Sequence, residues 1–195
     1  MIPELIVTAL LVGWLLRGRF ARLAEVRIRY GWMIFVPLGM YLAAHAVNYS
    51  HVFPRDSWVF GAAHMVGLMA VMVVTFANRA IPGVKLMFAG VLANAVAIVS
   101  NGGLMPVWKP AARAIWGEAL FNKILSDPHV RHAFTDNLWA RLNFLGDVIA
   151  ARRPFFLCES VYSIGDVILS LGGLIAIVAI MRTPLPLERR LAGGT

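Results

Sequence analysis

The sequence predicts an all-α fold, a polytopic helical membrane bundle of about five spans with an amphipathic helical segment on its outer side. Hydrophobic residues make up 59% of the 195 residues and the mean hydropathy is +0.73, whereas soluble domains are typically about 45–50% apolar. The apolar residues are gathered into runs that contain almost no charge, as membrane spans are. A single long polar segment, residues 101–161, separates the last two runs. We therefore predict one membrane domain over residues 1–195.

Five apolar runs are candidate spans. A spanning helix needs about 20 apolar residues, and the first run is shorter, so whether it crosses the bilayer completely stays open. Pro37 predicts a kink in the second run. The predicted spans are residues 2–16, 30–47, 58–77, 83–100 and 162–181.

The basic residues predict the orientation of these spans. The net charge is +8, but the charges flank apolar runs, so we expect a lipid bilayer as the partner and no nucleic acid. Basic residues gather between 17 and 29, between 79 and 85 and after 182, whereas residues 48–57 carry only Arg55. The positive-inside rule then predicts an N-terminus outside and a C-terminus in the cytoplasm. No Lys or Arg precedes Arg17, so a signal peptide is not expected.

The polar segment 101–161 would lie outside and be ordered. Pro110 can occupy the first turn of a helix, and Asp127-Pro128 predicts its end. Apolar residues recur there at helical spacing, which predicts an amphipathic helix. A second helix is predicted over 129–145, and residues 142–151 could dip into the bundle as a re-entrant piece. The apolar stripe of the first helix comprises Ala112, Ile115, Trp116, Ala119, Leu120 and Ile124.

Polar residues inside the apolar runs lie in the outer half of each span. They are His45, His64, Asn94 and Asp166. Polar groups in hydrocarbon are costly and usually face a bundle interior or a water-filled cavity. Their shared depth predicts one outward-open pocket. Alternatively, each side chain bonds a neighbouring helix and only holds the bundle together.

Asp147 and Asp166 are the candidate catalytic residues. Each follows a glycine, which permits a tight turn or the close approach of another group. Two carboxylates held together cannot both ionise easily, so one can act as an acid and the other as a base toward a water molecule. In the alternative interpretation, Asp166 caps the last helix and Asp147 pairs with Arg152 or Arg153.

Asn101, Gly102 and Gly103 form a turn signal at the end of the fourth run. They could terminate the helix, or their amides could bind a carbonyl or an anion at the pocket mouth. We therefore predict substrate-binding roles for Asn101, Gly102, Gly103, His64, Asn94 and His45.

No metal site and no cofactor are expected. Cys158 is the only cysteine, so neither an internal disulfide nor a cysteine zinc cluster can form. His129 and His132 form an H-x-x-H pair, but no third ligand follows at a familiar spacing.

Three motifs carry a resemblance to known families. They are Asn-Gly-Gly-Leu-Met-Pro-Val at 101–107, Leu-Gly-Asp at 145–147 and Ser-Ile-Gly-Asp at 163–166. The chain resembles an uncharacterised family of small bacterial multi-spanning proteins, which implies a bacterial plasma-membrane protein and no particular activity. The order of Asp147 and Asp166 is also similar to that of the two catalytic aspartates of lipoprotein signal peptidases, although their Asn-Leu-x-Asp-Arg motif is absent here.

Three functional classes follow from these observations. The first is an Asp-dyad hydrolase or peptidase-like membrane enzyme that uses Asp147 and Asp166. The second is a small-solute or proton-linked transporter, in which Asp166 and His64 would titrate. The third is a non-catalytic accessory subunit or lipid-binding module, whose polar segment would dock a membrane-protein partner.

Overall fold

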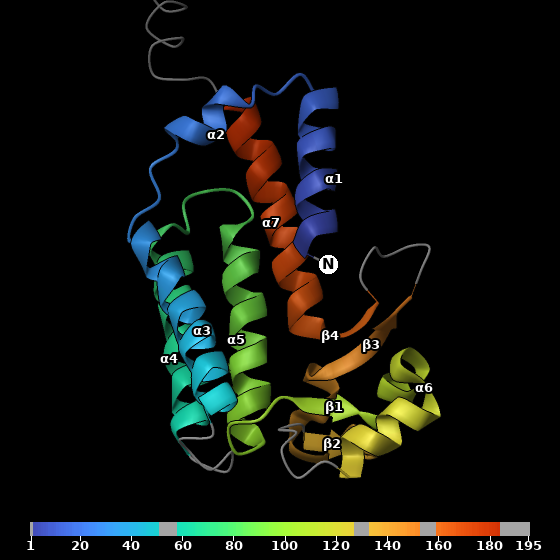
Figure 1. The fold of residues 1–195 in the computed structure, drawn as a ribbon. Coiled ribbons are helices and arrows are strands. Elements are labelled where there is room, and N and C mark those ends of the chain that lie inside the picture. Colours follow the sequence, from blue (N-terminus) through green and yellow to red (C-terminus); the bar gives the residue numbers. More distant parts are fainter. Residues whose placement is uncertain (1, 51–57, 127–132, 153–158, 184–195) are drawn as a thin grey trace, which may run out of the picture.

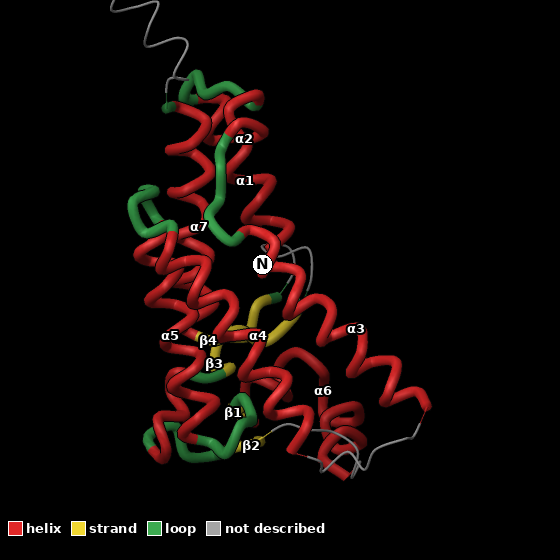
Figure 2. Tube along the Cα trace, turned by 90° about the vertical axis from the view of Figure 1, so that its left-hand side faces the viewer, coloured by secondary structure: helices red, strands yellow, loops and turns green. Residues whose placement is uncertain are grey.

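The computed structural model describes residues 2–50, 58–126, 133–152 and 159–183. Within these ranges, long helices lie side by side, a small sheet and α6 lie at one end of the array, and α2 lies at the other end (Figure 1). The view from the side keeps this order (Figure 2). The elements are α1 Ile2–Leu15, α2 Ala21–Glu25, η1 Gly31–Ile34, α3 Phe35–Ser50, α4 Trp58–Ala77, α5 Val84–Ser100, β1 Pro106–Trp108, α6 Lys109–Ser126, β2 Ala133–Thr135, η2 Ala140–Leu145, β3 Asp147–Ala151, β4 Ser160–Ser163 and α7 Ile164–Arg182.

The prediction of an all-α bundle of five spans is wrong. In the described ranges only α7, with 19 residues, is both long and apolar enough to cross a membrane. Helices α1, α3 and α5 have 14, 16 and 17 residues, at or below the lower limit of a spanning helix. The apolar runs do form helices close to the predicted bounds. The wrong part of the prediction is that five of these helices cross a membrane.

The polar segment contains a four-stranded mixed sheet, which also contradicts the all-α prediction. The strand order is β2-β1-β3-β4. Strand β1 pairs in parallel with both β2 and β3, and β3 pairs antiparallel with β4. Helix α6 connects the parallel strands β1 and β2, as parallel pairing requires a crossover.

The predicted helix after Pro110 exists as α6. A break at Gly117 changes which side of the helix is buried. This glycine has φ 73° and ψ 162°, which breaks the helical geometry inside the element. Beyond the break, Phe121 is fully buried whereas Leu120 of the predicted stripe is exposed. Phe121 packs with Val107 and Ala112 in the core beneath the sheet.

The second predicted helix and the re-entrant piece are also wrong. Residues 133–135 form β2, residues 140–145 form η2, and residues 147–151 form β3. Residues 127–132 lie outside the described ranges. The backbone N–H and C=O groups of β3 pair with those of β1 and β4. They therefore do not need the hydrogen bonds within a helix that a re-entrant helix would provide.

Glycines let α5 and α7 pack backbone against backbone. A Cβ on Gly90 would lie 2.5 Å from the carbonyl oxygen of Gly165, and a Cβ on Gly172 would lie 2.6 Å from the amide of Met87. Small residues at such interfaces permit close helix contact in membrane proteins. The position of α7 beside α5 therefore depends on Gly90, Gly165 and Gly172.

The C-terminal end of α7 is held by the segment that follows α1. The carbonyl oxygen of Met181 accepts hydrogen bonds from the guanidinium of Arg22, at 2.9 Å, and from the amide of Arg19, at 2.8 Å. A cation at the C-terminus of a helix interacts favourably with its dipole. The C-terminal end of α7 is thus bonded to the segment that follows α1.

Candidate functional site

The candidate site is built around the junction at which β4 becomes α7. Ser163 is the last residue of β4 and the N-cap of α7, and it is fully buried. Its hydroxyl accepts a hydrogen bond from the amide of Asp166 at 2.9 Å, and its own amide donates to Oδ2 of Asp166 at 3.1 Å. This pair is a capping box, which satisfies two amides at the start of the helix. The interpretation of Asp166 as part of the helix cap is therefore confirmed.

Asn94 closes a ring of hydrogen bonds with these two residues. It lies on α5, is buried, and is 72 residues away from Asp166 in the chain. Its Nδ2 donates to Oδ1 of Asp166 at 2.9 Å, and its Oδ1 accepts from the hydroxyl of Ser163 at 2.8 Å. The predicted inward position of Asn94 is thus explained by a bond between helices.

Gly165 leaves the space that this ring requires. A Cβ at Gly165 would lie 2.0 Å from Oδ1 of Asn94 and 2.6 Å from the carbonyl oxygen of Gly90, so no side chain fits there. The Ser-Ile-Gly-Asp motif therefore combines the cap hydroxyl, a position that must lack a side chain, and the carboxylate of the capping box.

The second aspartate, Asp147, lies on the neighbouring strand of the same sheet. It is the first residue of β3 and is paired with Ser163 on β4 and with Val107 on β1. Directly paired residues of antiparallel strands project from the same face, which brings Asp147 toward the face occupied by the Ser163 hydroxyl. Ser163 is therefore bonded to Asp166 and is the strand partner of Asp147.

The glycine before Asp147 explains how the strand reaches this position. A Cβ on Gly146 would lie 2.3 Å from the carbonyl oxygen of Pro106. The Leu-Gly-Asp motif thus packs its glycine against the Met-Pro-Val part of the first motif. All three sequence motifs meet at one place, although long stretches of chain separate them.

Asn101 and its two glycines end α5 in a Schellman motif. The amide of Gly103 donates to the carbonyl of Ile98 at 2.9 Å, the amide of Gly102 donates to that of Val99 at 3.3 Å, and Gly102 has φ 69°. This is the geometry in which a glycine terminates a helix. The glycine amides proposed for anion binding are therefore engaged with the helix.

The side chain of Asn101 has a positioning role. Its Nδ2 donates to the carbonyl of Ala97 at 2.9 Å and to that of Arg141 at 3.0 Å. Arg141 belongs to η2, which leads directly into Gly146 and Asp147. Asn101 therefore ties the end of α5 to the segment that delivers Asp147.

The environment changes the acidity of Asp147. Burial raises its pKa from 3.8 to about 7, and the nearby charge of Asp166 adds to this increase. Both effects disfavour a second negative charge. A group with this pKa exchanges its proton readily near neutral pH, which is the property that general acids and bases share.

The remaining predicted residues lie outside the described part of the chain or bond elsewhere. The side chains of His45 and His64, and the residues His129, His132, Cys158 and Arg153, lie outside what the structure describes. Arg152 donates to the carbonyl of Ala114 on α6. Among the described residues, no group of three or more His, Cys, Asp or Glu side chains could hold a metal ion.

Sequence reasoning missed Ser163. The Ser-x-x-Asp spacing before an apolar run is a signature of a capping box, so the signal was present. It was overlooked because the paired aspartates drew the interpretation toward chemistry.

The comparison with family models supplies the identity of the chain. The model of the family of unknown function DUF5317 matches residues 25–178. The chain belongs to DUF5317. The matched range includes the Asn94–Ser163–Asp166 ring and Asp147, so the whole candidate site lies in the region that defines this DUF5317 member.

A relative is similar over part of the chain. An uncharacterized protein of Thermotoga maritima is 38% identical over 95 residues, which is 49% of this chain and 50% of that protein. The match therefore spans about half the length of this curated relative. No solved structure matches the chain significantly.

Proposed function

We propose that this DUF5317 protein is a bacterial plasma-membrane hydrolase, in which Asp147 and Asp166 act on a water molecule at the end of α7. The placement of the two aspartates carries this proposal: Asp166 is bonded to Ser163, Asp147 is paired with Ser163 across the strands, and the charge of Asp166 acts on Asp147. Asn94 on α5 and Ser163 at the end of β4 hold Asp166 in place, which gives the pre-organised geometry that catalysis requires.

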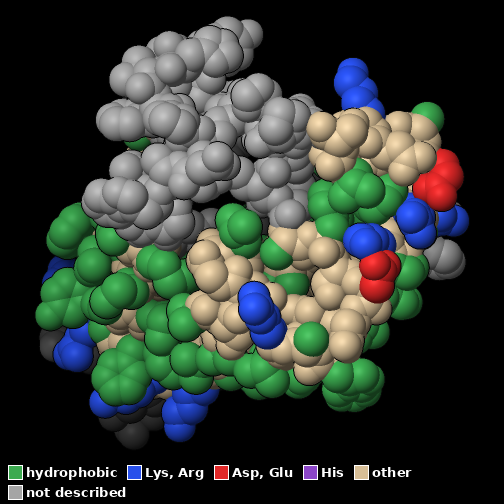
Figure 3. All heavy atoms as spheres, turned by 90° about the horizontal axis from the view of Figure 1, so that it is seen from below, with side chains coloured by type: hydrophobic (Ala, Val, Ile, Leu, Met, Phe, Trp, Pro, Cys, Tyr) green, Lys and Arg blue, Asp and Glu red, His purple; other side chains and the backbone are tan. Residues whose placement is uncertain are grey.

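Apolar side chains on the outer faces of the helices support a membrane location. Leu11 and Trp14 of α1, Phe35 of α3 and Leu171 of α7 are all more than half exposed, and soluble proteins rarely expose large contiguous apolar patches. Seen from the sheet end, hydrophobic side chains cover much of the left and lower parts of the visible face, whereas the visible acidic side chains lie at its right (Figure 3). The apolar length of α7 is consistent with a span that has its first turn at the outer surface.

The two carboxyl groups suit a hydrolytic step. The Asp166 carboxylate accepts a proton from water while the water oxygen bonds to a substrate carbonyl carbon, and protonated Asp147 donates its proton to the carbonyl oxygen. The resulting tetrahedral intermediate then collapses: the bond from carbon to the leaving group breaks, Asp147 takes back a proton, and Asp166 returns one to the leaving group. The aspartates regain their starting states, and the products are an acid and the protonated leaving group.

Purified protein in lipid nanodiscs tests this proposal. Internally quenched peptides and fluorogenic esters are incubated with it in water enriched in ¹⁸O, and mass spectrometry detects the label in the acid product. Asp147→Asn and Asp166→Asn should each abolish turnover, because each removes one of the two proton-transfer groups. Asp136→Asn is the matched control, since Asp136 is an exposed carboxylate that pairs with Lys109.

A non-catalytic role is the second candidate, and the closed hydrogen-bond ring favours it. Asn94, Ser163 and Asp166 satisfy one another and fix α5 against α7, which is enough to explain their presence in an accessory subunit. Absence of ¹⁸O-labelled product would reject the hydrolase in favour of this alternative, whereas full turnover by Asp147→Asn would reject the proton-transfer role of Asp147.

A further inference from the structure

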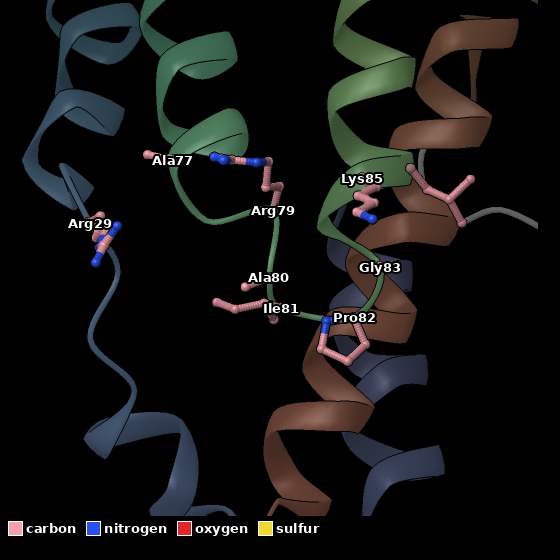
Figure 4. A pocket seen from close by; sticks show the side chains of 9 residues that line it. Arg29, Ala77, Arg79, Ala80, Ile81, Pro82, Gly83 and Lys85 are labelled. Atoms are coloured by element: carbon pink, nitrogen blue, oxygen red, sulfur yellow. The ribbon is translucent and has the colours of Figure 1, made fainter.

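A second candidate site lies where α4 turns into α5, at the start of α5. A hollow of about 620 Å³ opens there, within the range of about 300–1,000 Å³ that is usual for ligand pockets. Arg29 contributes from the segment before η1, Arg79 from the turn after α4, and Lys85 from the first turn of α5 (Figure 4). Ile81, Pro82 and Leu86 supply apolar lining.

The charge of this hollow favours an anion. Its lining contains three cationic side chains and no Asp or Glu. The first turn of α5 also has no acidic residue, so the positive end of the helix dipole adds to the same potential. Like charges that share one hollow repel each other, and a bound anion would offset this repulsion.

Bonds that do not depend on a ligand fix the backbone of Arg29 and the side chain of Arg79. The side chain of Asn78 accepts from the amide of Arg29 and donates to its carbonyl, both at 2.9 Å, and Asn78 is buried. The guanidinium of Arg79 donates to the carbonyl of Phe76 at 2.9 Å and stacks 4.4 Å above its ring. Only one of the five N–H donors of Arg79 is used by this bond.

An apolar face of α4 begins at Phe76, which contacts the Arg79 side chain of the hollow. Phe76, Val73 and Met69 follow one another along α4 at helical spacing, and all three are exposed. Leu86, on the hollow's own lining, is exposed as well. A small inorganic anion would leave this face unused, whereas a lipid would place its headgroup among the cations and its chains on the apolar side chains.

We propose that this hollow binds the phosphate-bearing headgroup of an anionic phospholipid, with the acyl chains along the exposed face of α4. The inference rests on the membrane location proposed above, but not on the hydrolase. The basic residues around the hollow belong to the connections that the sequence assigns to the cytoplasmic side, so the lipid would come from the inner leaflet.

Native mass spectrometry of the detergent-solubilised protein tests this inference. The probes are dioctanoyl phosphatidylglycerol, dioctanoyl phosphatidylcholine and inorganic phosphate. We expect one tightly bound phosphatidylglycerol, with an affinity that falls about five-fold for each cation removed. Arg79→Gln and Lys85→Gln should each show that loss, and the triple variant with Arg29→Gln should bind about a hundred-fold more weakly. Lys123→Gln, which removes an exposed lysine of α6, should bind like the wild type.

The outcomes separate the possible ligands. Equal binding of phosphatidylcholine, or binding that the Arg79 and Lys85 single variants leave unchanged, would overturn the proposal. Competition by millimolar phosphate with the same affinity as the lipid would assign the hollow to a soluble anion instead. Carbonate extraction of cell membranes tests the membrane location separately: a protein that stays in the membrane fraction but binds no phosphatidylglycerol refutes the lipid site alone.

Discussion

The wild-type protein should become less stable as the pH rises from about 4 to about 7, and Asp147→Asn should prevent this decrease. The pKa of Asp147 is about 7 in the folded protein against 3.8 for an ordinary aspartate, so between these values the folded state holds a proton that the unfolded state has released. Stability therefore falls as the pH rises through this window. The pKa difference of about 3, at about 1.4 kcal/mol per pH unit, sets an upper limit of about 4 kcal/mol, and local relaxation and water entry will reduce it.

Thermal unfolding in nanodiscs between pH 4 and pH 8.5 measures this effect. The Asp147→Asn variant has no ionisable group at position 147. Its melting temperature should therefore match that of the wild type near pH 4 and exceed it at pH 8. A change of about 2–4 kcal/mol corresponds to a difference of roughly 5–15 °C for a chain of this size. Because burial is the larger cause of the pKa change, most of the difference should persist when Asp166→Asn is added to both proteins.

The control variant is Asp136→Asn, which removes an exposed carboxylate and should leave the pH profile parallel to that of the wild type. Other acidic groups titrate over the same range, so the informative quantity is the difference between the wild type and Asp147→Asn. If that difference is the same at pH 4 and pH 8, Asp147 has an ordinary pKa and the acid–base interpretation fails.

Two further predictions concern packing. Gly165→Ala should destabilise the fold by about 1–3 kcal/mol, because the new Cβ would lie 2.0 Å from the side chain of Asn94; Gly39→Ala, on a helix position with nothing within 4 Å of the new atom, should be neutral or stabilising in the same chemical-unfolding assay. Asn101→Ala should cost about 0.5–1.5 kcal/mol and increase hydrogen exchange in η2, because the bond to the carbonyl of Arg141 is lost; unchanged exchange in η2 would contradict the positioning role.

The helices were predictable because their cause is local. Hydropathy marks the apolar runs, and the bounds of α4, at Trp58–Ala77, agree with the prediction, while those of α5, Val84–Ser100, differ by a single residue. The number of spans was not predictable in the same way, since an apolar helix of 14 or 16 residues has the composition of a span without its length.

The sheet was not predictable from local pattern. Strands β1 and β2 have three residues each, too few to establish a period-two alternation. Their stability depends on partners far along the chain, such as Val107 opposite Asp147. The predicted apolar stripe of α6 was wrong for a related reason. The break at Gly117 changes which side chains are buried without changing the composition of the helix.

The candidate site was predicted in part. Asp147 and Asp166 were paired from their glycine context, and the charge of Asp166 contributes to the raised pKa of Asp147. Their catalytic role stays a prediction. The bond from Asn94 to Asp166 could not be derived, because a bond across 72 residues leaves no periodic signal in a single sequence.

The ring and Asp147 differ in what they contribute to the fold. Ser163, Asn94 and Asp166 exchange hydrogen bonds, so their presence follows from the need to start α7 and to hold it against α5. The carboxyl group of Asp147 has the opposite effect at neutral pH: burial and the neighbouring charge both oppose its ionisation, and an uncharged side chain would remove that cost. A residue that lowers stability where a simple substitution would raise it is better explained by function than by packing. For this reason Asp147, rather than the more thoroughly bonded Asp166, is the residue whose replacement most directly separates a catalytic protein from a structural one.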